Sequence, residues 1–144
     1  METPTDTTVQ AWVQLVRAHQ EALSYIESAL KSSNYPPLIW YDILLELEHA
    51  GTDGLRPFEL EHALLLRQYG VSRLVERIEK AGYLVRKSCL KDGRGQSLHI
   101  TQSGKTLRQH MWEIYGPAIE KAIGSKLSDT QTKTLSELLG KLRK

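Results

Sequence analysis

Apolar residues recur along this chain with a helical period, broken by short runs of glycine, proline and polar residues. From Thr7 to about Ser32 the apolar seam keeps a seven-residue spacing, through Val9, Val16, Leu23 and Leu30 and, three residues later, Trp12, His19 and Ile26. A seam near 3.5 residues per repeat is typical of a helix that packs along a partner helix. We expect this long helix to be a dimer arm; the alternative is packing on its own domain.

Three shorter helices are predicted next. Pro36 and Pro37 break the first helix and suit the start of a second, which runs to Ala50, and Pro57 opens a third. The fourth spans about Arg67 to Ala81. Its apolar residues fall at i, i+3, i+4 and i+7 and predict a core-facing stripe of Val71, Leu74, Val75 and Ile78. The opposite side presents Gln68, Tyr69, Ser72, Arg73 and Arg77.

The rest of the chain predicts a hairpin and two more helices. Tyr83–Leu90 and Gln96–Ile100 are expected as strands around a Lys91–Gly95 tip, with Leu98 and Ile100 pointing inward and Leu55 adding a short third strand. Thr101–Gly104 is expected to cap a long fifth helix that bends at Gly116-Pro117, and Ser128–Gln131 fits a capping box for the last. The fold class is therefore mainly α with a small β-hairpin wing (α+β): a winged helix-turn-helix lobe with long N- and C-terminal helices.

Charge is distributed unevenly along the 144 residues, although the formal net charge is only +2. Residues 1–66 carry 3 Lys and Arg against 10 Asp and Glu, whereas residues 67–105 carry 9 against 3, a net charge of +6. The basic block coincides with the fourth helix and the hairpin. Such a footprint favours a polyanionic partner. A merely solvated charged surface is the alternative.

Composition excludes several classes of protein. A hydrophobic content of 40% with 25% charged residues is globular. No apolar run approaches the roughly 20 residues that span a bilayer, so we expect no membrane partner and a cytoplasmic location. The single cysteine, Cys89, excludes an intrachain disulfide, and the histidines show no ligand spacing, so neither a metal nor a cofactor is expected. No phosphate-binding glycine loop or HExxH motif occurs, and we expect no enzymatic activity.

Three segments in order carry a family resemblance: Arg77–Val85, at the end of the fourth helix; Asp92–Gly95, at the hairpin tip; and Ile100–Gly104, at the start of the fifth helix. With the flanking long helices, these segments resemble the MarR family of winged-helix transcription regulators. The resemblance implies a homodimer formed by residues 1–34 and 105–144, with residues 35–104 as the DNA-binding lobe. It also implies binding to a pseudo-palindromic operator in double-stranded DNA, often relieved by a small aromatic or phenolic effector.

The candidate DNA contacts lie on the fourth helix and the wing. Gln68, Tyr69, Ser72 and Arg73 come early enough on the helix to meet base edges or phosphates in the major groove. Arg77 either contacts DNA or is held by Glu76 or Glu79. On the wing, Arg94 is flanked by glycines and suits the minor groove, and Lys91 suits a phosphate. The resemblance implies that Asp92 supports the wing conformation.

The candidate effector residues are aromatic and polar side chains on the long helices. They are Trp12, Arg17, His19, Trp40, Tyr41 and Trp112. Such a set would enclose a planar acid, with His19 or Arg17 meeting its carboxylate; the alternative is that these residues form dimer core. Cys89 is expected to be a passive strand thiol, with a redox sensor as the alternative.

We expect a dimeric repressor that blocks polymerase access and is released by its effector. Two alternatives remain open at this point. Arg67 stands where the family commonly has a capping serine, and Gly70 falls within the predicted helix, so the lobe is alternatively a protein-interaction module that has lost operator binding. The other alternative is a DNA-binding regulator with no small ligand.

Overall fold

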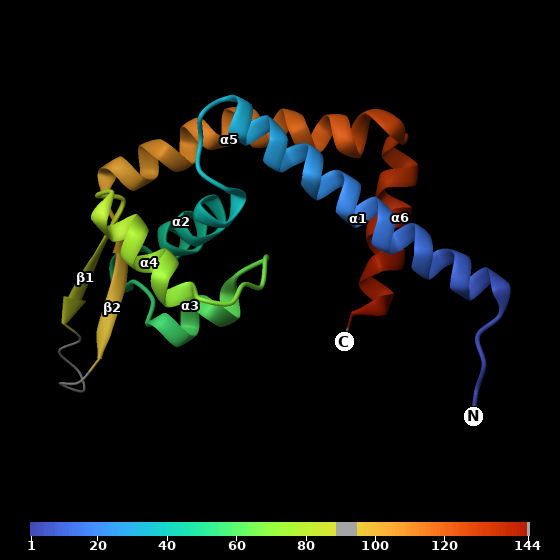
Figure 1. Cartoon of the computed structure of the whole chain (residues 1–144), viewed down its shortest axis with the longest axis horizontal. Helices are drawn as coiled ribbons and strands as arrows, with labels where there is room; N and C mark the ends of the chain where they lie inside the picture. Colours follow the sequence, from blue (N-terminus) through green and yellow to red (C-terminus); the bar gives the residue numbers. More distant parts are fainter. Residues whose placement is uncertain (89–94, 144) are drawn as a thin grey trace. The chain divides into compact units, whose positions relative to one another are not determined.

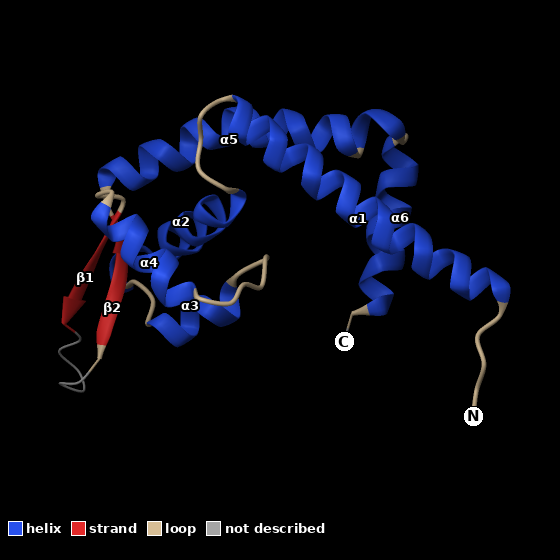
Figure 2. Cartoon of the chain, viewed as in Figure 1, coloured by secondary structure: helices blue, strands red, loops and turns tan. Residues whose placement is uncertain are grey.

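The computed structural model describes residues 1–88 and 95–143 of the chain and divides them into two compact units (Figures 1 and 2). One unit combines Met1–Ser33 with Ile114–Lys144, and the other is Asn34–Glu113. The boundary falls inside a helix, which contributes residues to both. The elements are α1 Asp6–Ser32, α2 Leu38–Ala50, η1 Gly51–Asp53, α3 Pro57–Ala63, α4 Val71–Lys80, β1 Leu84–Ser88, β2 Gln96–Ile100, α5 Gln102–Ala122, η2 Gly124–Lys126 and α6 Asp129–Leu142. The predicted fold class is confirmed.

The unit Asn34–Glu113, called here the lobe, is built around one apolar cluster. The helices α2, α3 and α4 and both strands contribute buried side chains to it: Ile39, Ile43, Leu44, Leu47, Leu60, Val71, Val75, Ile78, Leu84 and Leu98 among them. The predicted stripe of α4 supplies three of these, Val71, Val75 and Ile78. Their burial decides which side of α4 faces solvent.

The fourth helix begins later than predicted. It starts at Val71, and Gly70 is its N-cap with a left-handed φ of 77°, so Arg67–Gly70 is irregular chain. Two sequence expectations are therefore wrong. Gly70 does not weaken the helix interior, because it lies at a cap conformation that glycine adopts without a steric penalty. Arg67 is not the cap position, because the helix begins four residues further on.

The wing is a two-stranded antiparallel hairpin in which Leu84 pairs with Ile100 and Ser88 with Gln96. The predicted third strand is confirmed as an isolated bridge, because Leu55 and Leu98 exchange both backbone hydrogen bonds, at 3.0 and 2.7 Å. Next to it, Gly54 has a φ of 64°, and a Cβ there would lie 2.5 Å from the His99 ring. Only glycine fits this approach of the chain to β2.

The predicted caps of the last two long helices are confirmed. Thr101 Oγ1 accepts the Gly104 N–H at 3.1 Å at the start of α5. Ser128 and Gln131 form the reciprocal capping box of α6, at 3.1 and 3.0 Å. Helix α5 continues through Pro117 to Ala122.

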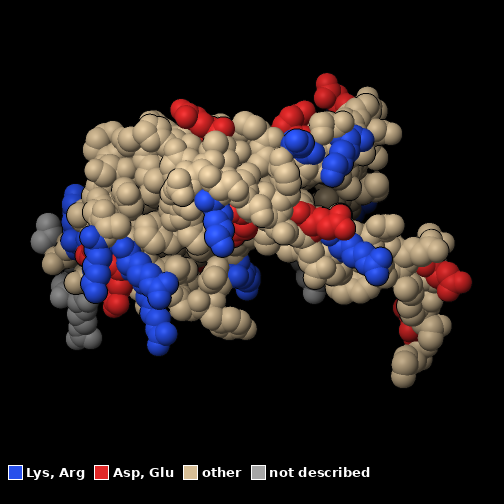
Figure 3. All heavy atoms as spheres, turned by 45° about the horizontal axis from the view of Figure 1, so that its top comes forward, with Lys and Arg blue, Asp and Glu red and all other residues tan. Residues whose placement is uncertain are grey.

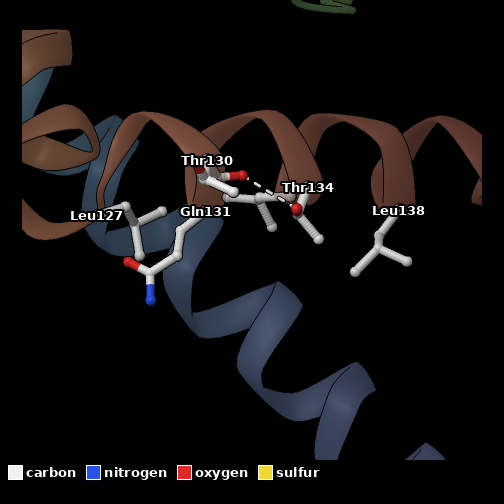
Figure 4. Close-up of a pocket in the computed structure, with 6 residues that line it drawn as sticks. Leu127, Thr130, Gln131, Thr134 and Leu138 are labelled. Atoms are coloured by element: carbon white, nitrogen blue, oxygen red, sulfur yellow. Dashed lines mark hydrogen bonds between the residues drawn. The ribbon is translucent and has the colours of Figure 1, made fainter.

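The unit Met1–Ser33 with Ile114–Lys144 leaves much apolar surface open. On α1 the predicted seam is buried only near the C-terminal end, at Ile26 and Leu30, whereas Val9 is exposed and the Trp12 side chain is 64% exposed. On α6 an open groove is lined by Leu127, Thr130, Gln131, Thr134, Leu135 and Leu138. Figure 4 shows Leu127, Gln131 and Leu138 extending to the same side of the helix. No helix in the described part of the chain is long and apolar enough to cross a membrane.

The cap conformation of Gly70 gives a stability prediction. Gly70→Ala should lower the free energy of unfolding by about 1–2 kcal/mol, because a Cβ disfavours the left-handed region, although it would meet no atom within 4 Å. Gly140→Ala is the matched control. That glycine lies within α6, where alanine should stabilise the helix by up to about 1 kcal/mol. Urea denaturation of both variants checks the opposite signs, and a neutral or stabilising Gly70→Ala would contradict the assignment.

Candidate nucleic-acid interface

The exposed side of α4 carries hydroxyl and guanidinium groups. Ser72, Arg73 and Arg77 are all exposed, opposite the buried stripe. Because packing of the buried stripe fixes the rotation of α4, these three side chains face solvent without other contacts to orient the helix. The structure therefore brings these three predicted residues to one accessible surface.

Two further predicted residues precede the helix instead of lying on it. Gln68 and Tyr69 belong to the irregular connection between α3 and α4, and the Tyr69 side chain is fully exposed. They lie at the N-terminal end of α4, next to its Gly70 cap. The predicted set thus divides into a connection part, Gln68 and Tyr69, and a helix part.

Arg77 does not form the ion pair with Glu79 that was one alternative from the sequence. Glu79 instead pairs with Arg86 of β1, at 3.1 Å between Oε1 and Nε. Within residues 1–88 and 95–143, Arg77 takes part in no ion pair. Its guanidinium is thus available to a partner, while the Glu79–Arg86 pair joins α4 to the wing.

The wing tip itself lies outside the described residues, and with it the predicted Lys91, Asp92 and Arg94, as well as Cys89. Both strands that lead to the tip are described. Lys87 is exposed on β1, and Arg86 is half-buried.

Sequence reasoning missed a further basic residue, Arg56. It follows the Leu55 bridge directly and is the N-cap residue of α3. Its guanidinium lies so close to Gly95 that a Cβ on that glycine would be 3.2 Å from the Arg56 Cζ. The expected pairing of Leu55 with the hairpin was the available signal, because it places the next residue beside the wing.

The electrostatics of the lobe follow from these positions. Figure 3 shows several Lys and Arg side chains close together on the winged-helix lobe, with a few acidic side chains between them. The acidic ones near α4 include Glu79, which is neutralised locally by Arg86. A positive surface around an exposed helix attracts a polyanion and speeds its association.

One histidine at the base of the wing stays neutral. His99 is buried on β2, and its Nε2 lies 2.7 Å from the Ser97 hydroxyl. Burial lowers the pKa of His99, Lys87 lowers it further, and Asp53 acts in the opposite direction. His99 therefore adds no positive charge near neutral pH.

The predicted effector residues are divided between the two units. Trp12, Arg17 and His19 are exposed on α1, in one unit. In the lobe, Trp40 packs edge-on against Tyr83, with ring centroids 6.2 Å apart.

The other two aromatic residues of the set contact each other. Tyr41 is buried and stacks on Trp112 with centroids 6.2 Å apart and an interplanar angle of 24°. Arg108 lies over the Tyr41 ring and pairs with Glu48 at 2.5 Å. These contacts give Tyr41 a packing role that joins α2 to α5. Among the described residues, no group of three or more His, Cys, Asp or Glu is placed to hold a metal ion.

Comparison with known proteins agrees with this geometry. The model of the MarR family matches residues 34–95. HTH-type transcriptional regulators of Bacillus cereus and Bacillus thuringiensis are 25% identical over 133 residues, which is 92% of this chain and 86% of theirs. These matches are to regulators and not to enzymes.

Solved structures show the same fold. A MarR-family transcriptional regulator of Streptomyces coelicolor, crystallised in complex with DNA, superposes with a TM-score of 0.88 at 23% identity, covering 99% of this chain and 89% of that one. AbsC, a MarR-family regulator of the same organism, gives a TM-score of 0.86 at 20% identity, covering 99% and 95%. At these identities the likeness establishes the fold alone.

Proposed function

We propose that this chain is a sequence-specific DNA-binding regulator of the MarR type that acts as a homodimeric repressor. The match of the MarR family model to residues 34–95 supports this proposal. The observation that carries the proposal is the exposed polar side of α4, with Arg73 and Arg77 on it, in a segment of net charge +6. The S. coelicolor relative whose fold it shares was crystallised with DNA. In this proposal the site of action is the cytoplasm.

In this proposal α4 enters the major groove. The groove admits one helix and presents a distinct set of donors and acceptors for each base pair. Ser72 and Arg73, in the first turn of the helix, reach base edges, together with Gln68 and Tyr69 from the connection. Arg77, two turns into the helix, meets a phosphate.

The wing contributes a second set of contacts. In this proposal Arg94 enters the minor groove and Lys91 meets a phosphate. The family resemblance implies a supporting role for Asp92. Arg56 lies against Gly95, directly before β2 of the same hairpin, and adds a cation there.

Arg73→Ala tests the reading role of α4. The probe is the duplex that the wild-type chain enriches most strongly from a random-sequence pool. If Arg73 makes a bidentate contact with a base, binding should weaken by about 1–3 kcal/mol and the preference at one position should relax. Lys133→Ala, which removes an equally exposed cation from α6, is the control and should bind like wild type. A folded Arg73→Ala protein with unchanged affinity would exclude this surface as the reading site.

The homodimer is proposed from surface that a single chain leaves uncovered. Val9 and Trp12 lie on the heptad seam of α1, and Leu135 and Leu138 line the groove of α6. All four are exposed in the single chain. Apolar surface arranged at heptad spacing favours a second copy of the same helix as the partner.

Sedimentation equilibrium tests the dimer. The wild-type chain should be dimeric at micromolar concentration, and Trp12→Glu should weaken association by at least about tenfold because it places a charge on a buried seam. Gln14→Glu introduces the same charge on the outer side of α1 and should leave the dimer intact. A folded wild-type monomer at that concentration would overturn the assignment.

We also propose release by a planar aromatic acid, with His19 and Arg17 as candidates for its carboxylate. Among the aromatic candidates, Trp12 lies on the same helix as these two residues, whereas Trp40 packs on Tyr83 and Tyr41 stacks on Trp112. Such a ligand lowers operator affinity only if it binds more tightly to the conformation that does not fit DNA.

A panel of aromatic acids tests this release. An active compound should quench tryptophan emission, raise the melting temperature and weaken DNA binding. His19→Ala should reduce that response while DNA binding without ligand persists; His110→Ala, an exposed histidine on α5, is the control. If no acid perturbs the wild-type protein and His19→Ala unfolds it, His19 is structural and the regulator works without this ligand.

The protein-interaction alternative loses its main support. It rested on a reading helix weakened at Arg67 and Gly70, and both residues precede α4. The glycine suits its left-handed cap. Failure of the wild-type chain to enrich any duplex would return this alternative to first place.

A further inference from the structure

The connection between α3 and α4 has little backbone support of its own. Helix α3 ends at Ala63 and α4 begins at Val71. Within the described chain, no backbone N–H from Leu65 to Gly70 donates to a backbone carbonyl. Yet this stretch carries Gln68 and Tyr69, and it leads directly into the first turn of α4.

A buried carboxylate on α2 supplies the missing acceptor. Asp42 is 5% exposed, and its Oδ2 accepts the Leu66 N–H at 2.8 Å. The neighbouring backbone N–H of Leu65 also favours the ionised form of this carboxylate and lowers its pKa. The Leu66 amide is thus held by a side chain 24 residues earlier in the chain. Leu64, buried in the core, anchors the start of the same segment.

A carboxylate is a costly side chain to bury at this position. Burial raises the pKa of Asp42, and the amides of Leu66 and Leu65 offset that effect only in part. The ionised side chain is therefore costly to bury, which is the usual balance for a charge inside a protein. An apolar residue would avoid that cost but could not accept the Leu66 N–H.

We propose that Asp42 is a positioning residue for DNA recognition: it fixes the connection from Leu65 to Gly70, and with it the base-reading residues Gln68, Tyr69 and Arg73. This inference rests on the proposed function and adds to it a determinant of specificity that does not touch DNA. It predicts that Asp42 affects discrimination between sequences more than affinity for DNA in general.

Asp42→Asn is the primary variant. It preserves shape but turns one acceptor oxygen into an NH₂ group that cannot accept an amide N–H. Binding is measured to the duplex that the wild-type chain enriches from a random pool and to an unrelated duplex of equal length. Affinity for the enriched duplex should fall roughly 10- to 100-fold, the scale of a lost base contact. Affinity for the unrelated duplex should stay within about twofold, because phosphate contacts dominate it.

The sign of this result separates positioning from electrostatics. Asp42→Asn removes a negative charge, which alone would strengthen binding to DNA. Glu46→Gln makes the same charge change at a half-buried position of α2 and is the matched control. It should retain wild-type discrimination.

A second control addresses general destabilisation. Leu47→Ala truncates a fully buried apolar side chain of α2. A leucine side chain cannot form a hydrogen bond with the connection. It should lower the melting temperature without changing the ratio of the two affinities. Hydrogen exchange at the Leu65 and Leu66 amides should be faster in Asp42→Asn than in Leu47→Ala. The two variants are compared under conditions that give them the same free energy of unfolding.

Each remaining outcome overturns the inference. Unchanged discrimination in Asp42→Asn, with faster exchange at Leu66, would show that the tether does not govern reading. A parallel loss of both affinities, as in an unstable variant, would make Asp42 purely structural; so would unfolding of Asp42→Asn and of Asp42→Ser under conditions where Leu47→Ala folds. Failure of the proposed function is seen separately, because the wild-type chain itself would then not discriminate between the duplexes.

Discussion

The accessible side of α4 is determined by the side that is buried. Val71, Val75 and Ile78 pack into the core that α2 and the wing strands share, and each contributes on the order of 1.5–3 kcal/mol of hydrophobic stabilisation. Rotating the helix would expose all three. Ser72, Arg73 and Arg77 therefore face solvent as a direct consequence of core packing, and the proposed reading of DNA depends on this constraint.

The ends of α4 need separate constraints, because the buried stripe of this ten-residue helix fixes its rotation better than it fixes the path of the chain that leads into it. Gly70 supplies the left-handed turn into α4, and Asp42 holds the preceding Leu66 amide. After the helix, Glu79 joins it to Arg86 of the wing. The lobe thus holds its proposed contact surface by one buried stripe, one glycine cap and two polar links to neighbouring elements.

Much of this fold is predictable from sequence because its signals are local. The i, i+3, i+4, i+7 stripe of α4 and the capping box at Ser128 each lie within a few residues, and both are confirmed. The expected alternation of Leu98 and Ile100 is not, because His99 between them is buried as well. The helix predicted from about Arg67 begins at Val71 instead. The prediction placed Gly70 inside the helix, where its low helix propensity is unfavourable. Propensity alone does not distinguish a helix interior from a left-handed cap.

The parts that sequence reasoning missed depend on contacts between distant residues. Nothing near Asp42 in sequence indicates that its carboxylate meets an amide 24 residues later, and the place of Arg56 follows only once Leu55 is paired with Leu98. In the same way, tryptophan and tyrosine signal packing or a ligand equally well until their neighbours are known. The stacking of Tyr41 on Trp112 assigns that pair a packing role.

Hydrogen exchange of the wild-type chain, with and without a saturating DNA duplex enriched from a random pool, tests the central claim most directly. The account predicts slower exchange on DNA binding in the connection from Leu65 to Gly70 and in the first turn of α4, with no change along Asp129–Leu142 of α6. Slowing confined to α6, or no slowing within the lobe while DNA is bound, would contradict the claim that this side of α4 reads DNA.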